Sequence, residues 1–348
     1  MLAKTKILVL GGGAWGTAFA SRLSAREKDF SVFLWSRDAR ASAEIQKERE
    51  NKRYLPGMTV HDRLEVSSNL ETLFENWQQS TNKTHCDYII FIAVPSSGFL
   101  DICSYLKIFD FPQRMKVVSL CKGVMECDEQ IVWPTQILGE FFDESDICVL
   151  SGPSFAKEVI QGLPFALTCA CKNISSAREV AKLLSGNGVR VYAEQDVLGV
   201  EIAGVMKNII AIAAGVCDGL NLGYNARASL ITRGLAETSR FGEALGAHPQ
   251  TFLGLSALGD IVLTATGSLS RNRSVGLDLA EGKSTELILR DLGHVAEGVN
   301  SVSKILRCAK SIGVSLPITS GVNSLVNGNL TAVEIVKELL ARDQTDER

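Results

Sequence analysis

The chain has 348 residues, of which 46% are hydrophobic and 22% charged, and its formal net charge at pH 7 is −3. This composition is typical of a globular protein with a large core, and the length predicts two domains. The low net charge argues against nucleic acid or a membrane surface as the main partner. Nine scattered cysteines without a C-x-x-C pair favour reduced thiols over disulfides or a metal site.

The run KILVLGGGAWGTAFA at 6–20 predicts a turn that binds a dinucleotide. A strand-like segment leads directly into Gly11, Gly13 and Gly16, and an apolar helix start follows. The first glycine permits the tight turn, the second lets a pyrophosphate approach bare backbone, and the third lets helix and strand pack closely. The helix N-terminus then offers N–H groups to the phosphates. A purely structural turn is the alternative, and the strand before and helix after the glycines argue against it.

Up to about residue 195, apolar runs alternate with helical patterns, as they do in βαβ units. The predicted strands are 6–10, 31–35, 88–94, 116–120, 147–150, 164–170 and 188–192. The predicted helices are 15–26, 38–49, 97–106, 129–141, 154–160 and 175–185. Because the first strand begins at Lys6, no signal or transit peptide is expected, and the predicted compartment is the cytoplasm.

Beyond residue 195 only helical patterns follow, at 197–218, 226–246, 272–281, 299–312, 317–327 and 331–341. The prediction is an α/β fold, with a doubly wound Rossmann-like dinucleotide-binding domain at 1–195 and an all-helical substrate-binding and catalytic domain at 196–348. The site is expected in the cleft between them. The apolar run 197–216 could span a membrane, but Glu201, Lys207 and Asn208 interrupt it, so a buried core helix is predicted.

The end of the second predicted strand bears on which cofactor binds. If that strand stops at Trp35, Ser36 and Arg37 occupy the ribose position, and both suit a 2′-phosphate. Asp38 is the alternative ribose ligand, and its structural interpretation is the N-cap of the next helix. We expect NADP(H) to be accepted at least as well as NAD(H).

Ten motifs in one order resemble the NAD(P)-dependent glycerol-3-phosphate dehydrogenases, particularly the bacterial type. They are GGGAWGTAFA (11–20), NKRYLPGM (51–58), AVPS (93–96), CKGVM (121–125), SGPSFAKEV (151–159), EIAGVMKNIIAIAAG (201–215), NARASLITRGLAE (225–237), GLSALGDIVLT (254–264), SRNRSVG (270–276) and VAEGV (295–299). The resemblance implies reduction of dihydroxyacetone phosphate to sn-glycerol 3-phosphate, the backbone of glycerophospholipids, with NADP or NAD as cofactor, and a homodimer.

The resemblance also implies roles for individual positions. The expected catalytic residues are Lys207, Lys122 and Asp260. The expected substrate ligands are these three with Gly152, Ser154, Asn208, Thr264, Ser270, Arg271 and Asn272. The expected cofactor ligands are Gly11, Gly13, Ala14, Trp15, Gly16, Ser36, Arg37, Lys122, Ala156, Arg271, Val295 and Glu297.

The chemistry of ketone reduction supports Lys207 as the proton donor. Burial and a second cation such as Lys122 would lower its pKa towards the range of about 7–8 that suits proton transfer, while Asp260 would oppose the shift. The alternative is a structural ion pair of Lys207 with Glu201 or Asp260. Lys122 follows an apolar strand, where the carboxyl ends of parallel strands meet ligands, and its alternative is a solvated loop lysine.

The remaining candidates each have a structural alternative. Asp260 could orient a lysine or cap a helix. Arg271 and Asn272 open a helix and are assigned to the substrate phosphate, with Arg271 shared with the cofactor, whereas Arg273 is assigned to the surface. Trp15 and Tyr54 flank the cofactor turn and are also explained by packing. None of His61, His85, His248 and His294 has metal-ligand spacing, so no metal is expected.

Ala257 stands where the family commonly has glycine, which puts the geometry of the loop beside Asp260 in doubt, and Thr238 replaces a common Met. The rival interpretations are another two-domain dehydrogenase of the 6-phosphogluconate or ketopantoate type, and a non-catalytic redox-sensing dinucleotide binder.

Overall fold

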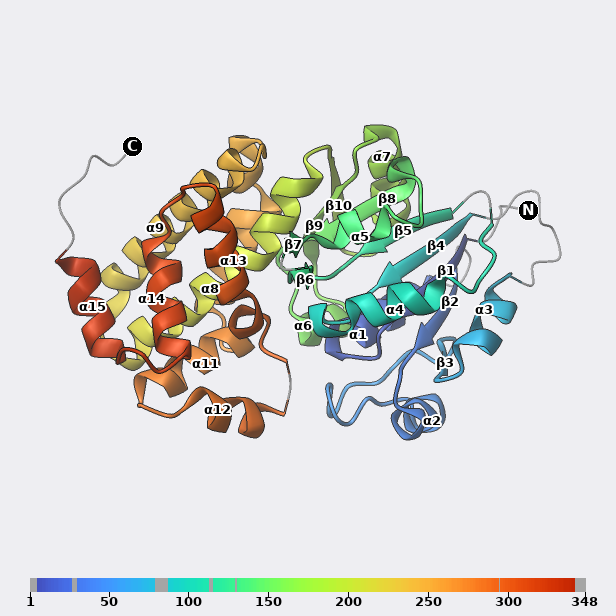
Figure 1. Cartoon of the computed structure of the whole chain (residues 1–348). Coiled ribbons are helices and arrows are strands. Elements are labelled where there is room, and N and C mark those ends of the chain that lie inside the picture. Colours follow the sequence, from blue (N-terminus) through green and yellow to red (C-terminus); the bar gives the residue numbers. More distant parts are fainter. Residues whose placement is uncertain are drawn as a thin grey trace. The chain divides into compact units, whose positions relative to one another are not determined.

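A computed structural model describes residues 5–26, 30–78, 87–112, 115–128, 130–293 and 295–341. The described residues form two compact units (Figure 1). One comprises Met1–Cys121 with Trp133–Val197, and the other comprises Lys122–Val132 with Leu198–Arg348. The segment 122–132, which the predicted ranges assign to the first domain, therefore belongs to the second unit.

The first unit is built on an eight-stranded sheet of order β10-β9-β8-β5-β4-β1-β2-β3. Its strands are β1 (Thr5–Leu10), β2 (Phe30–Trp35), β3 (Glu65–Ser67), β4 (Tyr88–Ile92), β5 (Met115–Ser119), β8 (Ile147–Ser151), β9 (Phe165–Ala170) and β10 (Val189–Glu194). All neighbours are parallel except β8 and β9. The strand order reverses between β1 and β4, and such a switch point is where open α/β sheets bind ligands.

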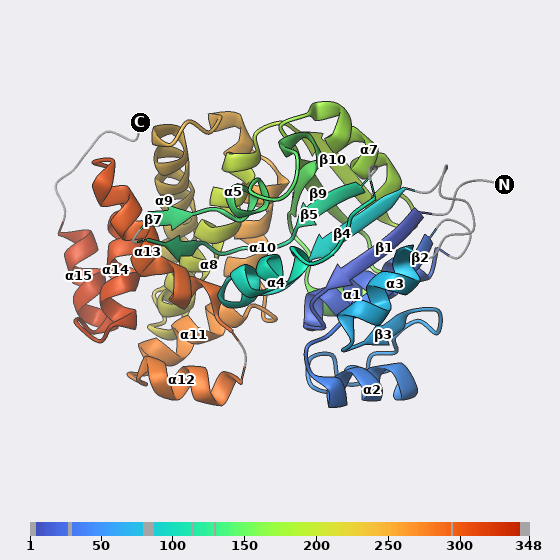
Figure 2. The ribbon, with the colours of Figure 1, turned by 45° about the vertical axis from the view of Figure 1, so that its right-hand side comes forward.

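Helices flank this sheet, and Figure 2 shows α1 and α3 beside β1 and β2. The helices are α1 (Ala14–Ser24), α2 (Ala39–Glu48), α3 (Leu70–Gln78), η1 (Ser96–Gly98), α4 (Phe99–Leu106), α5 (Pro134–Leu138), η2 (Glu144–Asp146), α6 (Ala156–Ile160) and α7 (Ile174–Leu184). Residues 7–10 of β1 and 90–92 of β4 have no exposed surface. Burial on both faces is the reason why these strands read as unbroken apolar runs.

The second unit is mainly helical. Its helices are α8 (Val197–Gly219), α9 (Gly223–Ala244), η3 (Pro249–Leu253), η4 (Leu255–Gly259), α10 (Asp260–Thr266), α11 (Arg271–Ala280), α12 (Thr285–Leu292), α13 (Glu297–Ser311), α14 (Pro317–Val326) and α15 (Ala332–Leu340). Among the described residues from 196 on, every element is a helix, as predicted. The antiparallel hairpin of β6 (Met125–Cys127) and β7 (Gln130–Val132) joins this unit from the first half of the sequence.

Helix α8 is the centre of the second unit. It is long and apolar enough to cross a membrane, but 89% of its most apolar window is buried inside the protein, as the sequence predicted of a core helix. Gly215 of α8 and Gly276 of α11 lie against each other, since a Cβ on Gly276 would come within 2.9 Å of the Gly215 Cα and 2.0 Å of the Ile212 carbonyl oxygen. This close crossing brings the start of α11 beside the polar residues of α8.

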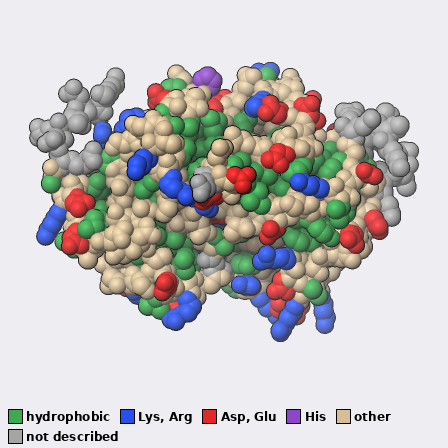
Figure 3. Space-filling view, in the orientation of Figure 1, with side chains coloured by type: hydrophobic (Ala, Val, Ile, Leu, Met, Phe, Trp, Pro, Cys, Tyr) green, Lys and Arg blue, Asp and Glu red, His purple; other side chains and the backbone are tan. Residues whose placement is uncertain are grey.

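The surface mixes charges of both signs. On the face shown in Figure 3, lysine and arginine side chains are interspersed with aspartate and glutamate. This distribution agrees with the low net charge of the chain.

Candidate functional site

The glycine turn after β1 has the geometry that the sequence predicted. Gly11 has φ +128°, and a Cβ there would lie 2.8 Å from the carbonyl carbon of Ala93. A Cβ on Gly16 would lie 2.0 Å from the Gly11 carbonyl oxygen, so α1 packs directly on the turn. At Gly13, the N-cap of α1, a Cβ would meet nothing within 4 Å. The turn therefore combines two close backbone contacts with one open position, which is the arrangement that a pyrophosphate needs.

Gly12 and Asn51 also shape this turn, and neither was assigned a role from the sequence. A Cβ on Gly12 would lie 2.4 Å from the Cβ of Ser36. The close contact with Ser36 therefore explains why a glycine stands at this position, which the motif leaves open. The buried Asn51 donates its side-chain amide to the Gly12 carbonyl at 3.0 Å and to the Thr17 hydroxyl at 2.8 Å. The only sequence signals were Gly12, the additional glycine between Gly11 and Gly13, and the NKRYLPGM motif that contains Asn51.

The end of β2 agrees with the register assumed from sequence. The strand ends at Trp35, Ser36 is buried, and Arg37 is exposed. Asp38 is the N-cap of α2 and accepts hydrogen bonds from the backbone N–H groups of Arg40 and Ala41. These hydrogen bonds lower the pKa of Asp38. The structural interpretation of Asp38 as the N-cap of this helix is therefore confirmed.

Trp15 links the glycine turn to the turn after β8. Its indole Nε1 donates to the carbonyl oxygen and to the hydroxyl of Ser154, both at 3.1 Å, and its ring stacks on Phe19 at 4.7 Å. Gly152 has φ +141°, which favours glycine, and its carbonyl accepts from the Ser154 hydroxyl at 3.1 Å. Ala14 begins α1 and Ala156 begins α6. Trp15 therefore packs and also orients Ser154.

In the second unit, two lysines share one buried carboxylate. Lys207 Nζ lies 2.8 Å from Asp260 Oδ1, and Lys122 Nζ lies 2.5 Å from Asp260 Oδ2. Thr264, one turn along α10 from Asp260, accepts from Lys207 at 3.0 Å and donates to Asp260 Oδ1 at 3.1 Å. The Asp260 side chain is 1% exposed, whereas that of Lys122 is 23% exposed. Lys122 is therefore the member of this group that solvent reaches most easily.

The electrostatics of this cluster favour a lysine that can change its charge state. Burial lowers the pKa of Lys207 to about 8; Asp260 acts to raise it, and the Lys122 cation acts to lower it. For Asp260, burial acts to raise the pKa, but Lys122 and Lys207 together hold it below its usual range. The cluster thus pairs a permanently charged carboxylate with a lysine poised near neutral pH.

Asp260 is not the N-cap of α10, although it follows the π-helical turn η4 as its C-cap. Gly259 is the N-cap of α10, and Asp260 is the first helical residue, with its carboxylate given to the two lysines. The preceding residues form a π-turn in which the Gly259 N–H reaches the Gly254 carbonyl at 3.2 Å. Ala257 is fully buried in this turn and does not have positive φ, so the loop tolerates alanine where the family commonly has glycine.

Asn208 and Asn272 form a buried chain of amides. Asn208 Nδ2 donates to the carbonyl oxygens of Lys122 at 3.1 Å and of Gly204 at 3.2 Å. Its Oδ1 accepts from Asn272 Nδ2 at 2.9 Å, and Asn272 Oδ1 accepts from the Gly298 N–H at 3.1 Å. Both side chains therefore spend most of their hydrogen-bonding capacity inside the protein, and their direct contact with substrate stays a prediction.

The SRN motif lies where the sequence placed it, at the start of a helix. Ser270 is the N-cap of α11, and its hydroxyl accepts from the Arg273 N–H at 3.2 Å. Arg271 is the first helical residue and is exposed. The assignment of Arg273 to the surface was wrong, because its side chain is only 18% exposed and pairs with Asp218 at 2.6 Å. Arg227 holds the same carboxylate from α9.

The last predicted cofactor ligands precede and begin α13. Val295 and Glu297 are both half-buried, and Glu297 is the first residue of the helix. Of the histidines, His85 and His294 lie outside the described residues. Among the residues that the structure describes, no three His, Cys, Asp or Glu side chains are grouped so as to hold a metal ion.

Comparisons with known proteins agree with these features. The family model described as NAD-dependent glycerol-3-phosphate dehydrogenase N-terminus matches residues 6–177, and the C-terminus model of the same family matches 196–337. A relative from Dechloromonas aromatica named glycerol-3-phosphate dehydrogenase (NAD(P)+) is 41% identical over 98% of this chain and 99% of its own length. A relative of the same name from Herminiimonas arsenicoxydans is 44% identical, with the same coverage. The crystal structure of glycerol-3-phosphate dehydrogenase from Coxiella burnetii superposes with a TM-score of 0.85 at 33% identity, covering 97% of this chain and 99% of that one.

Proposed function

Because this chain belongs to the NAD-dependent glycerol-3-phosphate dehydrogenase family, we propose that it reduces dihydroxyacetone phosphate to sn-glycerol 3-phosphate with NAD(P)H, in a reversible reaction. The observation that supports this most is the cluster in which Lys122 and Lys207 share Asp260. Family membership argues against the 6-phosphogluconate and ketopantoate types, and a non-catalytic dinucleotide binder has no use for a lysine poised near pH 8.

The first unit fits the cofactor. Gly13 leaves open space beside the N-terminus of α1, where backbone N–H groups would bind the pyrophosphate. Ser36 and Arg37 would meet the ribose end, and Ser154 and Ala156 would border the nicotinamide. When bound, the reduced nicotinamide supplies the hydride.

The second unit supplies the proton and holds the substrate. As hydride reaches the carbonyl carbon, negative charge develops on the carbonyl oxygen, and the Lys207 ammonium donates the proton that neutralises it. The contacts to Asp260 and Thr264 use two of the three donors of this ammonium. Lys122 would polarise the same carbonyl, and Arg271 at the start of α11 would bind the phosphate, where a helix N-terminus favours an anion.

We also propose an oligomeric state, a compartment and a metabolic role for the enzyme. The enzyme would act as a homodimer in the cytoplasm and supply glycerol 3-phosphate for glycerophospholipid synthesis. Sedimentation analysis of the purified chain tests the dimer, since a particle of one chain would contradict it.

A single assay tests the activity. The protein is mixed with dihydroxyacetone phosphate and NADPH or NADH, and absorbance of the reduced nicotinamide is followed. We expect oxidation of the cofactor, and at least a ~10²-fold loss of kcat in Lys207→Met, the lower range for an acid–base group. Lys283→Met, a change at an exposed lysine, is the control. No turnover with this substrate, or turnover only with ketopantoate and NAD(P)H or only with 6-phosphogluconate and NAD(P)+, would refute the proposed function.

A further inference from the structure

The segment that contains Lys122 is attached to the second unit through its backbone. The Lys122 carbonyl accepts from Asn208 Nδ2 of α8 at 3.1 Å, and the Val124 carbonyl accepts from Lys304 Nζ of α13 at 3.3 Å. Two side chains from different helices therefore hold alternate carbonyls of a stretch only three residues long. Asn208 is also linked through Asn272 to the first turn of α13, at Gly298.

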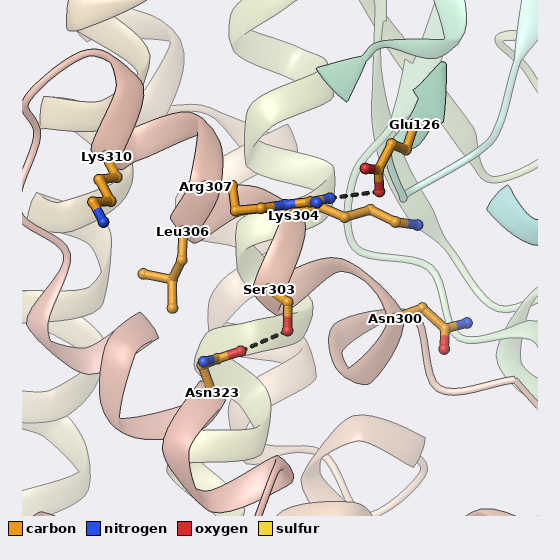
Figure 4. A pocket seen from close by; sticks show the side chains of 8 residues that line it. All are labelled: Glu126, Asn300, Ser303, Lys304, Leu306, Arg307, Lys310 and Asn323. Atoms are coloured by element: carbon orange, nitrogen blue, oxygen red, sulfur yellow. Dashed lines mark hydrogen bonds and ion pairs between the residues drawn. The ribbon is translucent and has the colours of Figure 1, made fainter. Parts of the chain in front are cut away.

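A second contact from α13 reaches the hairpin two residues further along the chain. Arg307 pairs with Glu126 of β6 at 2.5 Å. Figure 4 shows Lys304 and Arg307 extending from α13 towards Glu126, while Lys310 on the same helix lies apart from it. The pKa of Glu126 is lowered first by the hydrogen bond from Arg307 and also by the charge of Lys304, so both cations act on this carboxylate. The groove that these side chains line has a volume of about 490 Å³.

Burial of the neighbouring residues does not by itself set the direction in which the Lys122 side chain leaves the backbone. Val124 and Met125 are buried, and their burial keeps the segment on the second unit, but apolar contact is non-directional. Hydrogen bonds to carbonyl oxygens weaken steeply with angle and therefore fix how the backbone is turned. The Lys122 ammonium lies 2.5 Å from Asp260 Oδ2, and the orientation of the backbone at Lys122 sets where its flexible side chain begins and how readily the ammonium reaches that oxygen.

We propose that Lys304 and Arg307 are positioning residues, which hold the β6–β7 hairpin so that the Lys122 ammonium stays on Asp260. The inference rests on the function proposed above, because it gives Lys122 a place in that reaction. Neither side chain touches the reacting atoms; both act through the hairpin. When they are removed, Lys122 leaves Asp260 for part of the time, and Lys207 then faces Asp260 and Thr264 of α10 without the neighbouring cation that lowers its pKa.

The full-length enzyme with saturating cofactor tests this through Lys304→Met, Arg307→Met and the double variant. We expect kcat for ketone reduction to fall about threefold in each single variant and about tenfold in the double, as suits exposed contacts. The KM for NADPH should not change, and the pH midpoint of kcat should move upward in the double variant. Lys310→Met is the matched control, because it removes a cation from the same face of α13 but, among the described residues, no contact of Lys310 with the hairpin is seen.

A charge exchange separates positioning from general destabilisation. Glu126→Arg and Arg307→Glu should each lower kcat, and the two together should restore most of it and return the pH midpoint. Unfolding midpoints are recorded for every variant. An unchanged kcat and pH midpoint in the Lys304 and Arg307 variants, or failure of the exchange to restore them, overturns the inference. Lys122→Met reports on the proposed function separately: if it keeps full turnover, the role given to Lys122 is what fails.

Discussion

At the scale of single residues, the chemistry depends on how one carboxylate is divided between two lysines. Asp260 gives one oxygen to each, and both contacts are short. If Asp260 were paired with Lys207 alone, it would hold that lysine more firmly protonated. Burial is the main cause that lowers the pKa of Lys207 to about 8, and the Lys122 cation, which shares the carboxylate, also acts to lower it. Such a lysine can give and take a proton near physiological pH, which a surface lysine cannot.

The pKa of Lys207 predicts opposite pH profiles for the two directions. Reduction needs the ammonium as a general acid, so kcat should fall as pH rises through about 8. Oxidation of glycerol 3-phosphate needs the neutral amine as a general base, so kcat should rise through the same pH. Steady-state kinetics measured in both directions from about pH 6 to about pH 10, a range that brackets this pKa, checks the prediction. Profiles that move in the same direction would remove Lys207 as the titrating group.

Arg37 is predicted to favour NADPH. It is exposed at the end of β2, where the ribose would lie, while Asp38 is committed to capping α2. Loss of a charge-assisted contact to phosphate should lower kcat/KM for NADPH about tenfold in Arg37→Ala and leave kcat/KM for NADH nearly unchanged. Arg40→Ala, at an exposed position of α2, is the matched control. An equal loss with both cofactors, or a wild-type enzyme that strongly prefers NADH, would contradict the assignment.

At the scale of elements, the sequence predicted some helices correctly and others only in part. The start of α11 at the SRN motif and the buried helix α8 followed from local patterns. The helix predicted at 129–141 is right only in part, because α5 covers Pro134–Leu138 and a strand precedes it. Pro134 begins a helix, because its missing N–H is no loss at that position, but the residue before proline favours an extended backbone. Trp133 accordingly has ψ 151°, and the preceding residues form β7.

The crossing of α8 and α11 predicts a stability cost at Gly276. A Cβ there would lie 2.0 Å from the Ile212 carbonyl oxygen, which is backbone and cannot turn aside. Gly276→Ala should therefore shift α11 and lower the free energy of unfolding by about 1–3 kcal/mol. It should also raise KM for dihydroxyacetone phosphate, because Arg271 moves with α11. Urea unfolding and steady-state kinetics measure both effects. Gly98→Ala, where a Cβ meets nothing within 4 Å, should change neither.

At the scale of the whole molecule, the chain does not divide into two units at one point. It leaves the first unit at Lys122, forms the hairpin, returns at Trp133, and leaves again after Val197. The second unit therefore takes a buried part of itself from the first half of the sequence, including Val124 and Met125. The same excursion brings Lys122 to Asp260, which is 138 positions away along the chain.

This interleaving predicts how fragments behave. A fragment of residues 198–348 lacks the hairpin and exposes the apolar surface that Val124 and Met125 cover, so it should not unfold cooperatively. Joining residues 122–132 to that fragment through a flexible linker should restore a cooperative transition. Thermal unfolding followed by circular dichroism compares the two. A fragment that already melts as sharply as the linked one would show that the hairpin contributes little to the second unit.

The sequence by itself determined the glycine turn, the register at the end of β2, the buried nature of α8 and the motifs that place the chain in its family. These are local signals, because each depends on residue types and spacings within one strand, turn or helix. Only the tertiary structure decided that Lys122 and Lys207 share Asp260, that Asn208 and Asn272 form an amide chain, and that Arg273 is held by Asp218. Those contacts join segments far apart in the chain, and no local pattern encodes which distant partner a buried charge will find.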